Sequence, residues 1–165
     1  MTGRPTMTDG NDIETLRLIL AESRTIAVVG LSADWFRPSY FAAKYMLEHG
    51  YRILPVNPKY PEILGQRCFA SLSAIDEPVD IVDVFRRAAD VPPIAEQAAR
   101  IGARVLWQQL GVASESADRI AREAGLRSVF DRCVKIEHAR LFGGLNWVGV
   151  NTGVISAKRP RLGIR

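Results

Sequence analysis

The sequence has few of the residues that form metal centres and disulfide frameworks. Its 165 residues include two cysteines and two histidines, and the spacing of Cys68 and Cys133 fits neither a metal-ligand motif nor a disulfide scaffold. We expect both cysteines to be buried free thiols. No apolar run approaches the ~20 residues that span a bilayer, and the N-terminal segment lacks the apolar core of a secretion signal. These absences predict a cytoplasmic protein with no membrane partner.

The positive charge of the chain is modest. Hydrophobic residues make up 47% of the sequence and charged residues 24%, which is typical of a globular domain with a core. The net charge is +4, and part of the excess lies in the final segment, KRPRLGIR. A basic tail is a weak indicator of nucleic-acid binding, so nucleic acid is the disfavoured partner. That hypothesis would require binding that depends on this tail and weakens steeply with salt.

Apolar and amphipathic runs alternate along the chain. Five apolar runs are typical of buried strands, at 24–30, 51–57, 78–85, 103–109 and 126–130. The runs between and around them predict helices, with N-caps expected at Asn11 or Asp12, Ser39, Asp90, Ser114 and Asp131. Strands that alternate with helices imply crossover connections and a parallel sheet covered on both faces. The sequence therefore predicts an α/β protein with a doubly wound, mostly parallel five-stranded sheet in three α/β/α layers.

This pattern divides the chain into three parts. Residues 1–11 are predicted to form a polar N-terminal tail, 12–142 the doubly wound α/β domain, and 143–165 a C-terminal arm with the basic tail. The arm is rich in glycine and apolar residues, so it is a candidate contact for a homodimer.

Cationic and amide side chains follow the predicted strands. In open parallel sheets, ligands bind beyond the carboxyl ends of the strands. Of the four loops after the first four strands, three carry lysine or arginine and none concentrates acidic residues; the cations are Arg37, Lys59, Arg86 and Arg87. Gly30 allows a tight turn, and Ser39 would cap a helix whose free N–H groups face the same edge. The pattern predicts a phosphate-binding loop and an anionic ligand.

Two absences narrow the choice of ligand. An NAD site needs an acidic residue at the end of the second strand, but this chain has Asn57 there, followed by Lys59. A cation at this place favours an adenosine with an extra ribose phosphate, as in NADP or coenzyme A. The first loop also lacks the second and third glycines of G-x-G-x-x-G and holds Trp35, Phe36 and Arg37 instead. This loop favours coenzyme A, with Trp35 expected to anchor the loop in the core rather than cover the adenine.

Four segments together resemble a known family. They are VVGLSADWFRPSYFAAKYMLEHGYRILPVNP, VDIVDVFRR, WQQLG and DRCVKIEHAR. They resemble the small bacterial CoA-binding domain proteins, which are similar to the CoA-binding domain of the succinyl-CoA synthetase alpha subunit. The resemblance covers residues 25–141 and implies a Rossmann-like fold that binds coenzyme A or acyl-CoA.

The resemblance also implies a role for each part of the site. The first loop, with Ser32, Arg37 and Ser39, would meet the pyrophosphate, and Asn57 and Lys59 would lie on the adenosine and ribose-phosphate side. The turn after the third strand would lie under the ligand, and the pantetheine arm would pass Gln108. The full predicted set of CoA-binding residues is Gly30, Ser32, Arg37, Pro38, Ser39, Asn57, Pro58, Lys59, Phe85, Arg86, Arg87 and Gln108.

The chain departs from the synthetase in its catalytic residues. The synthetase uses a phosphorylated histidine in a second domain, and we expect no equivalent here. His49 is expected at a helix end, and Glu137 cannot orient its neighbour His138 because adjacent helical residues do not face each other. Cys133 and His138 are five residues apart, which also places them on different faces. The prediction is a stand-alone CoA-binding protein without catalysis of its own; the alternative is an NADP-dependent reductase or an acyl-CoA-handling enzyme.

Overall fold

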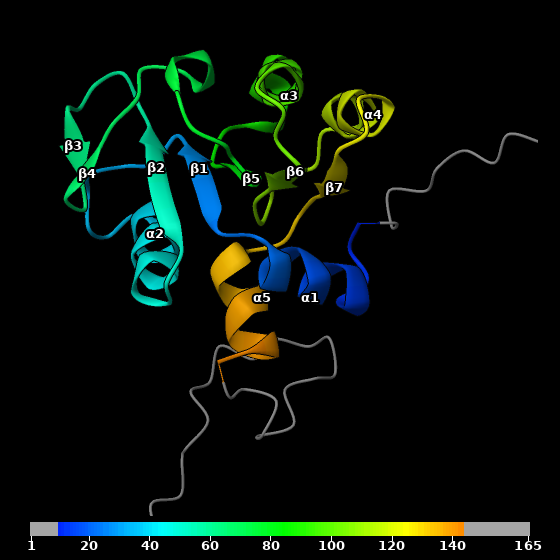
Figure 1. Ribbon diagram of the computed structural model, residues 1–165, viewed down its shortest axis with the longest axis horizontal. Coiled ribbons are helices and arrows are strands. Elements are labelled where there is room, and N and C mark those ends of the chain that lie inside the picture. The colour runs from blue at the N-terminus through cyan, green and yellow to red at the C-terminus, as the bar shows by residue number, and fades with distance from the viewer. Residues whose placement is uncertain (1–9, 144–165) are drawn as a thin grey trace, which may run out of the picture.

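The sheet at the centre of the protein has five parallel strands. The structure is a computed structural model, and it describes residues 10–143. Across the sheet lie, in order, β2 (Arg52–Val56), β1 (Thr25–Val29), β5 (Ile81–Val84), β6 (Val105–Gln108) and β7 (Arg127–Val129) (Figure 1). All four pairings are parallel. The predicted fold class and all five predicted strands are confirmed.

Helices cover both faces of the sheet and complete the three layers (Figure 1). One face carries α1 (Ile13–Glu22), α2 (Pro38–Glu48) and α5 (Val134–Leu141), and the other carries α3 (Val91–Arg100) and α4 (Glu115–Glu123). Successive strand residues point to opposite faces. Ile26 and Val28 of β1 therefore pack into the first core, and Ala27 and Val29 pack into the second. Because both cores are apolar, the strands read as continuous hydrophobic runs.

Two of the predicted helix caps are confirmed in full, and two are wrong. The Asp12 side chain accepts from the backbone N–H of Thr15, and the Ser114 side chain caps α4. Ser39 does not cap α2, because the helix begins at Pro38 and Arg37 occupies the N-cap position. Asp131 does not cap α5. Its backbone has a φ of 51°, its carboxylate accepts from the N–H of Gly111 at 2.7 Å, and Cys133 takes the N-cap position.

A fifth predicted cap, Asp90, is in the right place but makes no capping bond. It precedes α3, whose first turn holds two prolines as predicted. Its carboxylate instead accepts from Nε of Arg87 at 3.2 Å.

A short hairpin after β2 was not predicted. It consists of β3 (Glu62–Ile63) and β4 (Gln66–Arg67), which pair antiparallel. The turn between them places Leu64 and Gly65 at positive φ. Phe69, just after β4, bridges to Val56 at the edge of the main sheet. The hairpin therefore extends the structure beside β2, next to the loop that carries Lys59.

The chain reverses its direction of winding between β1 and β5. It moves from β1 to β2 on one side and then returns to β5 on the other, which is the arrangement that opens a crevice at the carboxyl edge. Gly30 follows β1 at this point with a φ of 84°, and a Cβ there would lie 2.6 Å from the carbonyl oxygen of Phe85. Only glycine allows the two loops to approach so closely.

The predicted terminal segments are mostly outside the described residues. Asn11, at the end of the predicted tail, exchanges two hydrogen bonds with the backbone of Phe130. Apart from Gly143, the predicted C-terminal arm lies outside the described residues, so its role as a dimer contact stays a prediction. Within residues 10–143, no helix has the length and apolar character to cross a bilayer.

Candidate functional site

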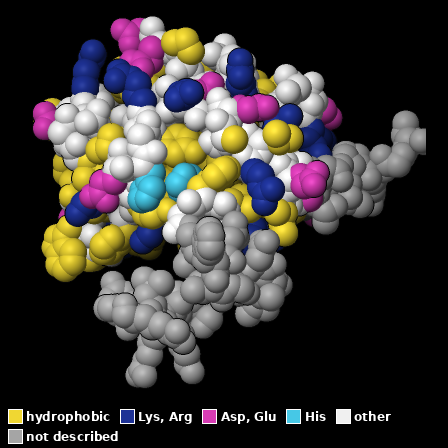
Figure 2. All heavy atoms as spheres, turned by 60° about the horizontal axis from the view of Figure 1, so that its bottom comes forward, with side chains coloured by type: hydrophobic (Ala, Val, Ile, Leu, Met, Phe, Trp, Pro, Cys, Tyr) yellow, Lys and Arg dark blue, Asp and Glu magenta, His cyan; other side chains and the backbone are white. Residues whose placement is uncertain are grey.

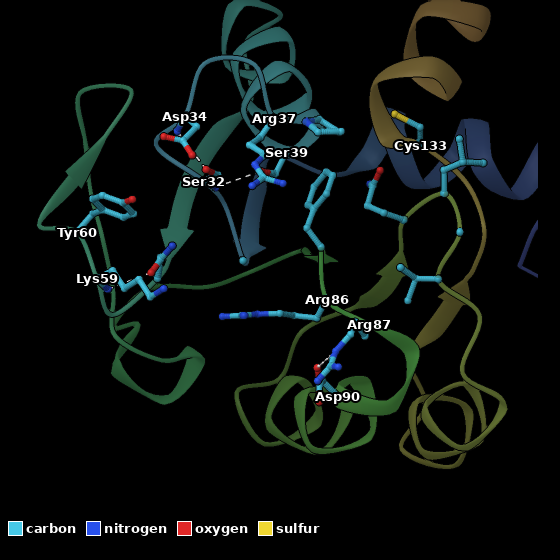
Figure 3. Close-up of a pocket in the computed structure, with 18 of the residues that line it drawn as sticks. Ser32, Asp34, Arg37, Ser39, Lys59, Tyr60, Arg86, Arg87, Asp90 and Cys133 are labelled. Atoms are coloured by element: carbon cyan, nitrogen blue, oxygen red, sulfur yellow. Dashed lines mark hydrogen bonds and ion pairs between the residues drawn. The ribbon is translucent and has the colours of Figure 1, made fainter.

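A cavity of about 1030 Å³ lies at the carboxyl edge of the sheet (Figure 3). The loops after β1, β2, β5 and β6 form its walls, and the first residues of α2 and of α5 complete them. Its lining residues are Gly30, Ser32, Asp34, Arg37, Pro38, Ser39, Asn57, Lys59, Tyr60, Phe85, Arg86, Arg87, Asp90, Gln109, Leu110, Gly111, Val112, Cys133 and Ile136. The cavity therefore sits where the strand order predicts a ligand site.

Hydrogen bonds hold the loop after β1 in place. The backbone N–H of Ser32 donates to Oγ of Ser39 at 3.0 Å, and the N–H of Asp34 donates to Oγ of Ser32 at 3.1 Å. Asn57 joins this loop to the next one, because its Nδ2 donates to the carbonyl of Leu31 at 2.9 Å and its Oδ1 accepts from the N–H of Lys59 at 3.0 Å. Ser39 and Asn57 therefore build the walls of the cavity.

The first turn of α2 offers few free N–H groups to an anion. Pro38 has no N–H, and the N–H of Tyr40 already donates to the carbonyl of Arg37 at 3.1 Å. Ser39 is left as the N–H donor at this end. The predicted anion site at the free N–H groups of this helix is therefore largely wrong, and an anion in the cavity would depend mainly on side-chain cations.

Three cations from three different loops line the cavity without a carboxylate partner. Arg37, Lys59 and Arg86 are exposed, and no ion pair joins any of them to an acidic residue within residues 10–143. In Figure 3 the Arg86 side chain extends from the end of β5 toward the side where Lys59 lies. Arg87 differs, because Asp90 neutralises it. The positive charge is available to a polyanionic ligand.

The end of the cavity away from Lys59 and Tyr60 has no charged side chain among its lining residues. Gln109, Leu110, Val112, Cys133 and Ile136 line it, and Figure 3 shows Cys133 on the side away from Lys59 and Tyr60. Both cysteines are free, as predicted, but they are half-buried rather than buried. Burial raises the pKa of the Cys133 thiol, so this thiol stays protonated at neutral pH and is a poor nucleophile.

The structure brings most of the predicted site residues together, but not all. Ten of the twelve line the cavity; Pro58 and Gln108 do not. The Gln108 side chain is fully buried and bonds to the backbone N–H and carbonyl of Ser114. Gln109 takes the predicted place of Gln108. The Trp35 prediction is wrong, because this side chain is 70% exposed and cannot anchor the loop in the core.

Several residues that line the cavity were not predicted from the sequence. Tyr60 lies beside Lys59 in the turn before the unpredicted hairpin. Cys133 and Ile136 line the cavity because α5 begins there. The DRCVKIEHAR segment was noted in the sequence, but nothing in it indicated that its first turn would reach the loop after β6.

The two histidines of the chain lie together, on the face shown in Figure 2. Their ring centroids are 5.2 Å apart. Nδ1 of His138 shares a hydrogen bond with the Tyr45 hydroxyl, and Nδ1 of His49 donates to the Tyr45 carbonyl. Burial and, to a lesser degree, His49 lower the pKa of His138. Glu137 does not bond to His138, as predicted, and pairs instead with Arg140, which was not predicted. Neither histidine lines the cavity.

Comparison with known proteins gives one family and several relatives. A family model for a CoA binding domain matches residues 24–139. Uncharacterized protein YneT of Bacillus subtilis is 43% identical over 124 residues, which cover 75% of this chain and 92% of that protein. The structure of a hypothetical protein from Pyrococcus horikoshii OT3 is 40% identical and has a TM-score of 0.79, covering 87% of this chain and 99% of that one.

A more distant match is to part of a larger enzyme. The ADP-forming acetate–CoA ligase of Methanocaldococcus jannaschii is 26% identical over 81 residues, which are 49% of this chain and 12% of the ligase. The shared segment is thus a small part of that enzyme.

Proposed function

This chain belongs to the CoA-binding domain family, and from that premise we propose that it binds coenzyme A, free or acylated, as a stand-alone protein without catalysis of its own. The observation that carries the proposal is the meeting at one cavity of three cations, Arg37, Lys59 and Arg86, that have no ion-pair partner among residues 10–143. A volume of about 1030 Å³ is at the upper end of the range of about 300–1,000 Å³ for small-molecule sites, which suits a ligand as long as coenzyme A.

The charge distribution of the cavity indicates the orientation in which coenzyme A would bind. The phosphates of coenzyme A are at its adenosine end, and its pantetheine arm is uncharged. We therefore place the ribose phosphate beside Lys59 and the pyrophosphate beside Arg37 and the N–H of Ser39. The pantetheine arm then passes Phe85 toward the uncharged end, where Gln109 and Cys133 lie.

Direct titration tests this proposal. Isothermal titration of the full chain with coenzyme A should give saturable binding, and coenzyme A should raise the melting temperature because it binds only the native state. Dephospho-CoA should bind more weakly, and NADP⁺ and NAD⁺ should have smaller effects. Arg119, exposed on α4 and away from the cavity, offers a matched control. Arg119→Ala should leave affinity unchanged.

The same set of ligand titrations distinguishes coenzyme A binding from the alternative function. A shift with NADP⁺ but none with coenzyme A would replace the proposal with the nucleotide-dependent reductase, because Lys59 could equally hold a 2′-phosphate. Absence of a response to either ligand would remove both.

A further inference from the structure

A buried carboxyl group lies beneath the uncharged end of the cavity. Asp83 is in the central strand β5 and its side chain is only 1% exposed. It faces the α1, α2 and α5 side of the sheet, like its register partner Val28 in β1. The described residues offer it no cation: its hydrogen-bond partner is the side-chain amide of Gln109, which is itself buried.

This contact fixes the orientation of an amide that lines the cavity. Nε2 of Gln109 donates to Oδ1 of Asp83. A side-chain amide has two N–H donors and one carbonyl acceptor; one N–H is committed to Asp83, and the carbonyl oxygen, Oε1, makes no bond to Asp83. Within residues 10–143, no donor bonds to this oxygen. The uncharged end of the cavity therefore presents a fixed hydrogen-bond acceptor to whatever enters it.

An acceptor at this position distinguishes the two forms of coenzyme A. The free thiol carries an S–H, which is a weak donor. A thioester has no S–H and places a carbonyl oxygen beside the sulfur, so two acceptors would face each other. Since buried acceptors without a donor are costly, the acylated form is the poorer match.

We propose that the site selects free coenzyme A over acyl-CoA, with Gln109 as the selectivity residue that meets the thiol and Asp83 as the positioning residue that holds its amide. This inference rests on the proposed function and on the direction given there to the ligand. It predicts a protein that responds to the pool of unacylated coenzyme A.

Three ligands separate the contributions to this selectivity. Under reducing conditions, the dissociation constants of coenzyme A, S-methyl-CoA and acetyl-CoA are measured by titration of the full chain. S-methyl-CoA lacks the donor without adding an acceptor, so it should bind about threefold to tenfold more weakly than coenzyme A. Acetyl-CoA should bind more weakly still.

Variants then assign the effect. Gln109→Leu removes the acceptor and should bring the three affinities together. Asp83→Leu leaves the Gln109 amide without its partner, so Gln109 is no longer held in one orientation and the preference should narrow. Asp118→Asn removes another buried carboxylate, on α4 and outside the cavity; it should keep the wild-type preference. If Asp83 had a merely structural role, its substitution would change the stability of the protein but not the ratio of the affinities for the three ligands.

The outcomes are distinct. Equal affinity of the wild-type protein for all three ligands would overturn the inference while leaving coenzyme A binding intact, as would a preference that survives in Gln109→Leu. Failure of all three ligands to bind would instead refute the proposed function. The wild-type comparison needs no variant, so it decides the question even if a variant fails to fold.

Discussion

Replacing Asp83 by asparagine should make the protein more stable at pH 7, by an amount that shrinks as the pH is lowered. Burial raises the pKa of this carboxyl group to about 8, and the hydrogen bond from Gln109 offsets only part of the effect. The unfolded chain has an ordinary aspartate, with a pKa of about 3.9. Between these two values the folded protein holds a proton that the unfolded chain has released. Stability therefore falls as the pH rises from about 4 to about 8.

The size of the effect follows from this difference in protons. One proton per molecule changes the free energy of unfolding by about 1.4 kcal/mol per pH unit. Between pH 5 and pH 7, Asp83 should thus cost the wild-type protein about 2–3 kcal/mol. Asparagine is nearly the same shape and does not titrate, so its variant should lose none of this stability. The titration of His138 is common to both proteins and cancels in their difference.

Urea denaturation at pH 5, 6, 7 and 8 measures the quantity directly. The stability of the variant minus that of the wild-type protein should increase with pH up to about 8 and then level off. A difference that is constant between pH 5 and pH 8 would refute the reasoning, because it would mean that Asp83 has the same pKa in both states. A difference that decreases with pH would mean that the folded protein favours the charged carboxylate.

Other substitutions test the walls of the cavity. Arg37→Ala should weaken coenzyme A binding by about tenfold to a hundredfold in calorimetric titrations, since charge-assisted hydrogen bonds contribute about 1.5–3 kcal/mol; unchanged affinity would exclude Arg37 from the phosphate site. Lys59→Ala should show a similar loss of affinity for coenzyme A but none for dephospho-CoA. An equal loss of affinity for both ligands would show that Lys59 does not bind the ribose phosphate. Gly30→Ala should lower stability by about 1–3 kcal/mol from backbone strain alone, and by more because its Cβ would meet the Phe85 carbonyl. Gly125→Ala has nearly the same φ and no atom within 4 Å of a Cβ, so an equal loss of stability in the two variants would rule out the close contact as a cause.

The sequence predicted the sheet because its periodicity is strong and its faces are both buried. Every strand reads as a short apolar run bounded by polar residues, glycine or proline, and these features depend on local chemistry. Helix starts were less predictable. Ser39 has the right chemistry for a cap, but proline at the first helical position moved the start of α2 to Pro38. Asp131 was equally suitable, but its carboxylate bonds to Gly111, twenty residues away in sequence.

The cationic residues of the candidate site could be predicted from the sequence, but the residue whose role depends on the direction of its side chain could not. Arg37, Lys59 and Arg86 follow strands, so a parallel sheet had to bring them to the same edge. Gln108 and Gln109 are adjacent, and successive side chains point to opposite faces of a strand. Sequence alone did not say which of the two would reach the cavity, and the prediction chose the neighbour that bonds to α4.

The hydrogen bonds that Ser39 and Asn57 make with the loops after β1 and β2 have a kinetic consequence. The backbone around the cavity is in position before any ligand arrives, so entry would not wait for a loop to fold. The entropy lost on binding would come mainly from the ligand and from the exposed side chains of Arg37, Lys59 and Arg86. Association should accordingly be fast, and differences in affinity between variants should appear mostly in the rate of release.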